Sequence, residues 1–187
     1  MNDGEALPDR RRPRPLDEAG LQALALHYVA RYATSRAKLA AYLARKLKAR
    51  PWGGAAPPDI MAVVTRMAAL GYVDDAAYAA SKRREMTTRG LGPRRVAQAL
   101  RAAGVAEDPA DHGPAAVPDA AGRDAYEVAL RYAERKRLGP FARVPATDPA
   151  SRRRALAAML RAGHDMDIAR RLLAAPHADA ARRLCED

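Results

Sequence analysis

Apolar residues recur along this chain every three or four positions, the spacing that places them on one face of an α-helix. The pattern predicts helices over residues 16–32, 59–70, 74–88, 93–104, 124–138, 150–162 and 165–174. The spacing of Leu39, Leu43 and Leu47 marks another helix, which begins after Ser35. Prolines, which break helices, gather between these segments, at 8–15, 51–58, 109–118 and 140–149. Strand signals are nearly absent, so the sequence predicts an all-α fold.

A short basic pattern occurs three times. The copies are Ser35-Arg36-Ala37-Lys38-Leu39, Gly92-Pro93-Arg94-Arg95-Val96 and Ser151-Arg152-Arg153-Arg154-Ala155, and they lie 57 and 59 residues apart. Each begins with a residue suited to cap a helix, and an apolar residue follows, at Leu43, Leu100 and Met159. Because repeats of this kind contact only their neighbours, we expect an elongated tandem array of three three-helix repeats.

The domain boundaries follow the proline clusters and the turn glycines. We expect a disordered basic N-terminal arm over 1–15 and helical repeats over 16–73, 74–122 and 123–175, followed by a C-terminal tail over 176–187. The last helix of the second repeat is expected to be weak, because 106–122 is rich in proline and glycine. Gly71, Gly104 and Gly163 are placed to end helices.

Composition narrows the class of protein. Of the 187 residues, 49% are apolar, but 46 are alanine and only 5% are aromatic, which favours several small Ala/Leu-packed units over one large core. No apolar run is long enough to span a bilayer, and the arginines near the N-terminus precede no apolar stretch, so we expect neither a membrane span nor a secretory signal. The single cysteine, Cys185, has no internal partner, which favours a reducing cytoplasm.

Charge is concentrated in one region. The formal net charge is +11, and residues 31–106 hold 15 basic and 4 acidic residues. A binding surface for a polyanion explains this clustering better than a general solubility effect would. The candidate surface comprises Lys82, Arg83, Arg89, Arg94 and Arg95 around the glycine turn at Gly90 and Gly92, extended by Arg36, Lys38, Arg45 and Lys46. Backbone N–H groups near Arg94 are expected to add to phosphate binding. The alternative interpretation of the basic cluster is an exposed, solvated face with no ligand.

Catalytic and metal-binding signals are weak. The sequence contains neither a phosphate-binding loop of the G-x-x-x-x-G-K-[ST] type nor an H-E-x-x-H motif, and its four histidines have no metal-ligand spacing. Asp74 and Asp75 are interpreted as a helix cap and a first-turn acid, in preference to a Mg²⁺ site. His164 beside Asp165 is interpreted as a surface residue, and Trp52 as packing over the Gly53–Gly54 bend. We therefore expect no enzyme activity, no cofactor and no metal.

Four segments resemble the RecX family, regulators of the bacterial recombinase RecA. They are Gly71-Tyr72-Val73-Asp74-Asp75-Ala76-Ala77-Tyr78-Ala79, Arg89-Gly90-Leu91-Gly92-Pro93-Arg94-Arg95-Val96, Tyr32-Ala33-Thr34-Ser35-Arg36-Ala37-Lys38-Leu39 and Met159-Leu160-Arg161-Ala162-Gly163. The match spans about residues 21–173. It departs from the family at Ala162-Gly163-His164, where an Arg-Gly-aromatic sequence is usual.

The resemblance implies a non-enzymatic regulator with a fold of tandem three-helix repeats. Its expected partner is RecA and the RecA filament on single-stranded DNA, bound along the groove, with inhibition of ATP hydrolysis, strand exchange and co-protease activity. This would place it in recombination, DNA repair and the SOS response to DNA damage, as a monomer in the bacterial cytoplasm with possible direct DNA binding. Asp74 and Tyr78, with Gly71, Asp75, Gly90 and Gly92, are expected to be structural.

Two alternatives belong to other classes. A stand-alone basic helical DNA-binding (transcriptional) module would also place basic helices beside glycine turns. Against it, Gln98 is the only amide residue in the second basic helix. A helical scaffold that binds only acidic proteins is the third possibility.

Overall fold

The computed structural model describes residues 14–105, 118–143 and 148–184. Within these ranges every regular element is a helix, apart from one isolated parallel bridge between Leu16 and Trp52. The predicted all-α fold is therefore confirmed. The expected N-terminal arm lies almost wholly outside the described residues, as does most of the weak helix expected within 106–122.

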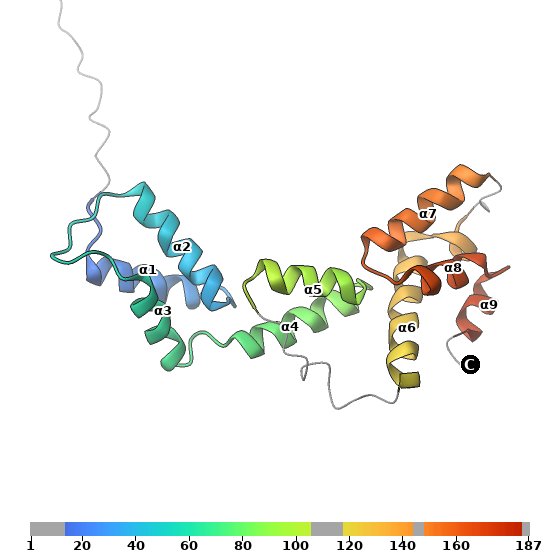
Figure 1. The fold of residues 1–187 in the computed structure, drawn as a ribbon, viewed down its shortest axis with the longest axis horizontal. Helices are drawn as coiled ribbons and strands as arrows, with labels where there is room; N and C mark the ends of the chain where they lie inside the picture. The colour runs from blue at the N-terminus through green and yellow to red at the C-terminus, as the bar shows by residue number, and fades with distance from the viewer. Residues whose placement is uncertain (1–13, 106–117, 144–147, 185–187) are drawn as a thin grey trace, which may run out of the picture. The chain divides into compact units, whose positions relative to one another are not determined.

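The helices follow one another along the chain in two compact units, residues 1–74 and 75–187. They are α1 (Glu18–Val29), α2 (Arg36–Ala49), α3 (Ile60–Ala69), α4 (Asp75–Thr88), α5 (Pro93–Ala102), α6 (Pro118–Lys136), the 3₁₀ turn η2 (Gly139–Phe141), α7 (Pro149–Arg161), α8 (Met166–Ala174) and α9 (Ala178–Arg183) (Figure 1). Most boundaries lie close to those predicted, but α6 begins at Pro118, six residues before the predicted start and inside the segment expected to hold the weak last helix of the second repeat. The segment expected as a C-terminal tail contains α9.

The first unit packs α1, α2 and α3 around one small core, centred on Leu21, Leu39, Leu43 and Val64. Its first helix begins two residues later than predicted. Leu16 exchanges hydrogen bonds with the segment 51–53, and the Asp17 side chain then accepts the Gly20 N–H at 2.8 Å as the N-cap. Trp52 packs against Gly54 as expected, and its Nε1–H donates to the Ala56 carbonyl at 2.7 Å.

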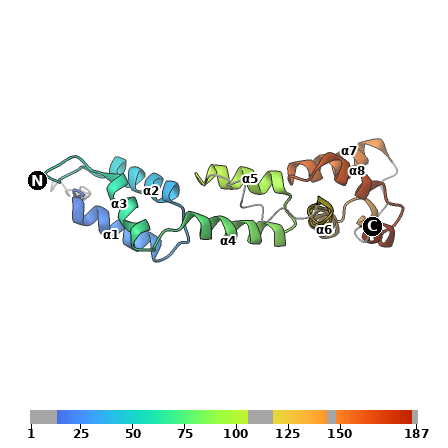
Figure 2. The same cartoon turned by 60° about the horizontal axis from the view of Figure 1, so that its bottom comes forward.

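The second unit holds two further cores. In Figure 2, α5 lies alongside α4, and the pair encloses Ala79, Met86, Val96 and Leu100. The other core forms where α6, α7 and α8 meet, around the fully buried residues Ala129, Ala133, Met159, Ala169 and Leu172. Alanine at three of these positions lets the helices approach closely.

The recurring basic pattern corresponds to equivalent helices. Leu43 of α2, Leu100 of α5 and Met159 of α7 are each fully buried, one in each core. Ser35 caps α2, and its Oγ accepts the Lys38 N–H at 3.2 Å. The interpretation of Ser151 as a cap is wrong: α7 begins earlier, with Asp148 as its N-cap and Pro149 at its first position. Ser151 instead donates its backbone N–H to Asp148 Oδ1 at 2.8 Å.

Five helices of the described ranges end in the same hydrogen-bonded turn. The residue after the cap has a positive φ, and its N–H and the next N–H bond back to the last turn, as in a Schellman motif. These residues are Gly71 (φ +75°), Gly90 (+70°), Gly104 (+67°), Arg137 (+53°) and Gly163 (+90°). Gly71, Gly104 and Gly163 were predicted from the sequence to end helices, and Gly90 was predicted to lie in a turn, whereas Arg137 carries no such signal.

Candidate nucleic-acid and protein interface

The predicted basic cluster lies around the turn that joins α4 to α5. Lys82 and Arg83 lie on α4, Arg89 follows its last residue, and Arg94 and Arg95 occupy the first turn of α5. Gly90 reverses the chain in the left-handed region, where a side chain would also meet the Tyr132 backbone nitrogen at 2.9 Å. Glycine is therefore required here by both conformation and space. The five cations thus lie on either side of this turn, within fourteen consecutive residues of the chain.

Glu85 pairs with two of the cations. Its Oε2 lies 2.8 Å from Lys82 Nζ, and its Oε1 lies 3.1 Å from Arg89 Nη1. The hydrogen bond from Lys82, followed by that from Arg89, lowers the pKa of Glu85. The structure thus brings Lys82 and Arg89 together through a carboxylate that a count of positive charges alone had overlooked, although its i+3 and i+4 spacing was visible in the sequence.

Arg94 is held by an acid from a distant part of the chain. Its Nη2 lies 3.0 Å from Asp165 Oδ2, while the Arg94 side chain remains 68% exposed. The pKa of Asp165 is lowered first by its hydrogen bond from the Asp167 backbone N–H and secondarily by Arg94. Arg95 turns to a different partner, the amide oxygen of Gln98. Arg94 is thus an exposed cation whose position is fixed by Asp165, the N-cap of α8.

The start of α5 and the end of α7 meet through their backbones, in what we term the α5–α7 turn contact. The Gly92 N–H donates to the Ala162 carbonyl at 2.9 Å, and the Arg94 N–H donates to the Gly163 carbonyl at 3.3 Å. The expectation that the N–H near Arg94 would bind phosphate is therefore wrong, because Gly163 already occupies that donor. Side chains at Gly92 or Gly163 would overlap the opposing backbone.

His164 is buried beside the α5–α7 turn contact, so its interpretation as a surface residue is wrong. The side chain is 1% exposed, its Nε2 lies 3.1 Å from the Gly90 carbonyl, and its ring lies 5.3 Å from the Tyr132 ring. Burial lowers the pKa of His164, and the hydrogen bond to Gly90 opposes that shift. A neutral imidazole with its proton on Nε2 satisfies the carbonyl. An imidazole ring thus stands where the resemblance to RecX implied an aromatic residue, and it packs on an aromatic partner.

The remaining predicted cations lie on α2, in the first unit. Arg36 and Lys38 belong to its first turn, which contains no acidic residue. Arg45 and Lys46 lie two turns further on, with their charged groups 5.6 and 5.4 Å from the centroid of the Tyr42 ring. Cations at the positive end of a helix dipole are unfavourable for the helix itself. Arg36 and Lys38 thus lie where the helix dipole alone would favour acidic residues.

The residues expected to be structural lie at the ends of helices or in their packing faces. Gly71 ends α3, Asp74 immediately precedes α4, and Asp75 is the first residue of α4. Tyr78 is partly buried against the α4–α5 core. Across the part of the chain that the structure describes, no group of three or more His, Cys, Asp or Glu residues is arranged to hold a metal ion.

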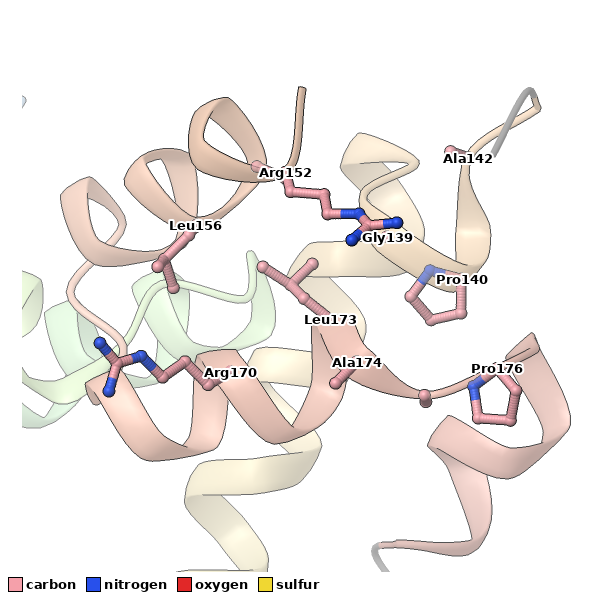
Figure 3. Close-up of a pocket in the computed structure, with 11 residues that line it drawn as sticks. Gly139, Pro140, Ala142, Arg152, Leu156, Arg170, Leu173, Ala174 and Pro176 are labelled. Atoms are coloured by element: carbon pink, nitrogen blue, oxygen red, sulfur yellow. The ribbon is translucent and has the colours of Figure 1, made fainter. Parts of the chain in front are cut away.

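A cleft of about 590 Å³ lies elsewhere in the second unit, among η2, α7 and α8 (Figure 3). Leu156 and Leu173 form part of its apolar lining, and Arg152 and Arg170 are its charged residues. Its lining suits apolar or anionic groups better than it suits acid–base chemistry. None of the predicted site residues lies in this cleft.

The fold and its surface define a class: an all-helical protein of tandem three-helix units whose basic residues gather at helix starts and glycine turns. The model of the second three-helix domain of RecX matches residues 74–112, which include α4, α5 and the turn between them. The Regulatory protein RecX of Myxococcus xanthus (strain DK1622) is 34% identical, over 92% of this chain and 97% of that protein. The chain belongs to the RecX family of regulatory proteins.

The fold agrees with a solved relative. A crystal structure of regulatory protein RecX superposes with a TM-score of 0.52 at 20% identity, covering 80% of this chain and 70% of that one. No helix within the described ranges is long and apolar enough to cross a bilayer.

Proposed function

We propose that this protein regulates RecA by binding the filament that RecA forms on single-stranded DNA. It lies along the filament groove and restrains ATP hydrolysis, strand exchange and co-protease activity, with no catalytic step of its own. The observation that carries the proposal is membership of the RecX family, at 34% identity to a regulatory protein over nearly the whole chain. It acts as a monomer in the bacterial cytoplasm, where RecA filaments form.

The basic surface gives this function a physical basis. Arg94 and Arg95 are exposed on α5, Arg94 is fixed by Asp165, and residues 31–106 carry 15 basic and 4 acidic residues. A chain with several small units can touch several RecA subunits at once, which raises the effective concentration without one strong contact. Contacts to DNA phosphates release counterions, so binding should weaken steeply with salt.

The test is the ATPase activity of RecA on single-stranded DNA, with this protein titrated well below one copy per RecA. Suppression at these ratios supports a regulator that caps or disassembles the filament. If suppression requires a protein concentration close to that of the DNA binding sites, the protein is a basic DNA-binding module. No suppression at any ratio contradicts the proposal.

The basic surface is tested with Arg94→Glu combined with Arg95→Glu. We expect an unchanged helical circular-dichroism signal and weaker filament inhibition. Because a glutamate at 94 would face Asp165, the pair Arg83→Glu with Arg95→Glu serves as a second variant that leaves the Arg94–Asp165 ion pair intact. Unchanged inhibition by both folded variants would remove the surface from the mechanism.

A further inference from the structure

Three tyrosines of the first unit form a connected series of rings, here termed the tyrosine ladder. Tyr28 near the end of α1 stacks on Tyr42 of α2, with ring centroids 4.2 Å apart and planes inclined by 19°. Tyr32, just beyond α1, contacts Tyr28 with centroids 5.2 Å apart and planes inclined by 45°. The ladder therefore runs across the surface of α1 and α2.

The two ends of the ladder differ. At one end, Arg45 and Lys46 lie over the Tyr42 ring. At the other end, the Tyr32 side chain is 56% exposed. Tyr28 and Tyr42 are partly buried against the core of the unit, so the inner rings are anchored while the outer ring faces solvent. The Tyr32 backbone N–H donates to the Tyr28 carbonyl at 3.0 Å, which fixes the outer residue to the end of α1.

The charge around the ladder suits a polyanion. Residues 31–50, which contain Tyr32 and all of α2, include seven basic residues and no acidic ones. The acids Asp17 and Glu18 lie at the opposite end of α1 from Tyr28. Proteins that hold single-stranded nucleic acid combine aromatic faces, on which bases stack, with cations that follow the phosphates. This segment supplies both.

We propose that Tyr32 is a stacking platform for an unpaired base of single-stranded DNA, with Arg45 and Lys46 holding neighbouring phosphates. The ladder presents a ring that is already oriented by Tyr28, so little side-chain freedom is lost when a base stacks on it. Duplex DNA keeps its base faces stacked within the helix, so the platform favours single strands. The inference rests on the proposed function only in taking single-stranded DNA as the ligand.

The test measures fluorescence anisotropy of a labelled 20-nucleotide oligothymidine with the full-length protein at low salt. The comparison ligand is an abasic strand of the same length and phosphate count. We expect Tyr32→Ala to weaken oligothymidine binding about 5- to 150-fold, the range for loss of one base–aromatic stack, and to leave abasic binding unchanged. Tyr32→Phe should keep the wild-type affinity.

Tyr72 provides a matched control, because it belongs to the same unit, is 54% exposed and lies outside the ladder. Tyr72→Ala should change neither affinity. Arg45→Gln with Lys46→Gln should weaken binding to both ligands and reduce the slope of log affinity against log salt by about 1.4, since about 0.7 is expected per phosphate contact. Circular dichroism confirms that each variant is folded.

Three results would overturn the inference: equal losses for the two ligands with Tyr32→Ala, no loss for either, or no wild-type binding to oligothymidine. The RecA ATPase titration separates this failure from that of the proposed function. Wild-type suppression at low ratios without a Tyr32 effect on DNA binding would leave the regulator intact and remove the platform. DNA binding that depends on Tyr32, without suppression of the RecA ATPase, would support the platform and contradict the proposed function.

Discussion

Replacing Gly92 with alanine isolates the effect of the close backbone approach between α5 and α7. Gly92 has φ −72° and ψ 164°, a conformation open to any residue, so alanine is not strained by its own dihedral angles. Its methyl group, however, would lie 2.6 Å from the His164 backbone nitrogen. The two backbones must separate to admit it, which weakens the hydrogen bonds Gly92–Ala162 and Arg94–Gly163.

The size of the effect follows from these contacts. Overpacking costs about 1–3 kcal/mol, and each weakened hydrogen bond costs about 0.5–1.5 kcal/mol. Alanine also restricts the unfolded chain, which offsets about 0.4–1 kcal/mol. The middle of the summed ranges gives an expected net loss for Gly92→Ala of about 2–4 kcal/mol, taken from a typical domain stability of about 5–15 kcal/mol.

Gly71→Ala is the matched control. Gly71 has φ +75°, and a methyl group there would meet nothing within 4 Å, so only the left-handed conformation opposes the change. That conformation costs about 1–2 kcal/mol, and the same restriction of the unfolded chain offsets part of it. The expected loss is therefore about 1 kcal/mol or less.

Hydrogen exchange of the full-length protein is the decisive assay, combined with urea unfolding followed by circular dichroism. In Gly92→Ala the amides of Gly92 and Arg94 should exchange about 30- to 700-fold faster, the factor that corresponds to about 2–4 kcal/mol. In Gly71→Ala they should keep wild-type rates. Wild-type protection of both amides in Gly92→Ala would refute the reasoning, as would a stability loss no larger than that of Gly71→Ala.

Two further predictions concern the same region. Because burial lowers the pKa of His164, the unfolded chain takes up its proton more readily, so the contribution of His164 is full above about pH 6.5 and falls as the pH drops below that value. The urea midpoint should therefore fall from pH 7.5 to 5.5 by more in the wild type than in His164→Phe, and equal falls would contradict this. Asp165→Asn keeps a side chain able to cap α8 but releases Arg94, so it should tighten binding of the labelled oligothymidine about two- to fivefold. Introducing Arg94→Gln as well should abolish that gain, whereas a gain that persisted would show that Asp165 acts by another route.

The sequence predicted the helices well because their limits are set locally. A cap such as Ser35 or Asp59, a periodic apolar face and a closing glycine such as Gly71 or Gly163 all lie within a few residues of the boundary they determine. Asp148 displaced Ser151 as the cap of α7 because it lies one residue before Pro149, a favoured first residue of a helix. That signal was also local and was available in the sequence.

The arrangement of the site was less predictable, because it depends on which helices meet. Helical periodicity shows which side of a helix is apolar and not which other helix covers it. Arg94 and Asp165 are 71 residues apart, and His164 reaches the Gly90 carbonyl across 74 residues. One local signal for His164 was available: it directly follows Gly163, the position at which a residue commonly packs back onto a helix end.

The two units carry their positive charge in different ways, and this matters for how each binds under the proposed function. Around the α4–α5 turn, Glu85 and Asp165 hold three cations in fixed positions and reduce the charge that a polyanion meets. Such preorganised, partly neutralised cations favour selective contact with a shaped protein surface. Residues 31–50 instead contain no acid and lie beside exposed aromatic surface, which favours nucleic acid. The net charge of +11 alone therefore does not predict the affinity for a polyanion, because the charge available for binding differs between the two surfaces.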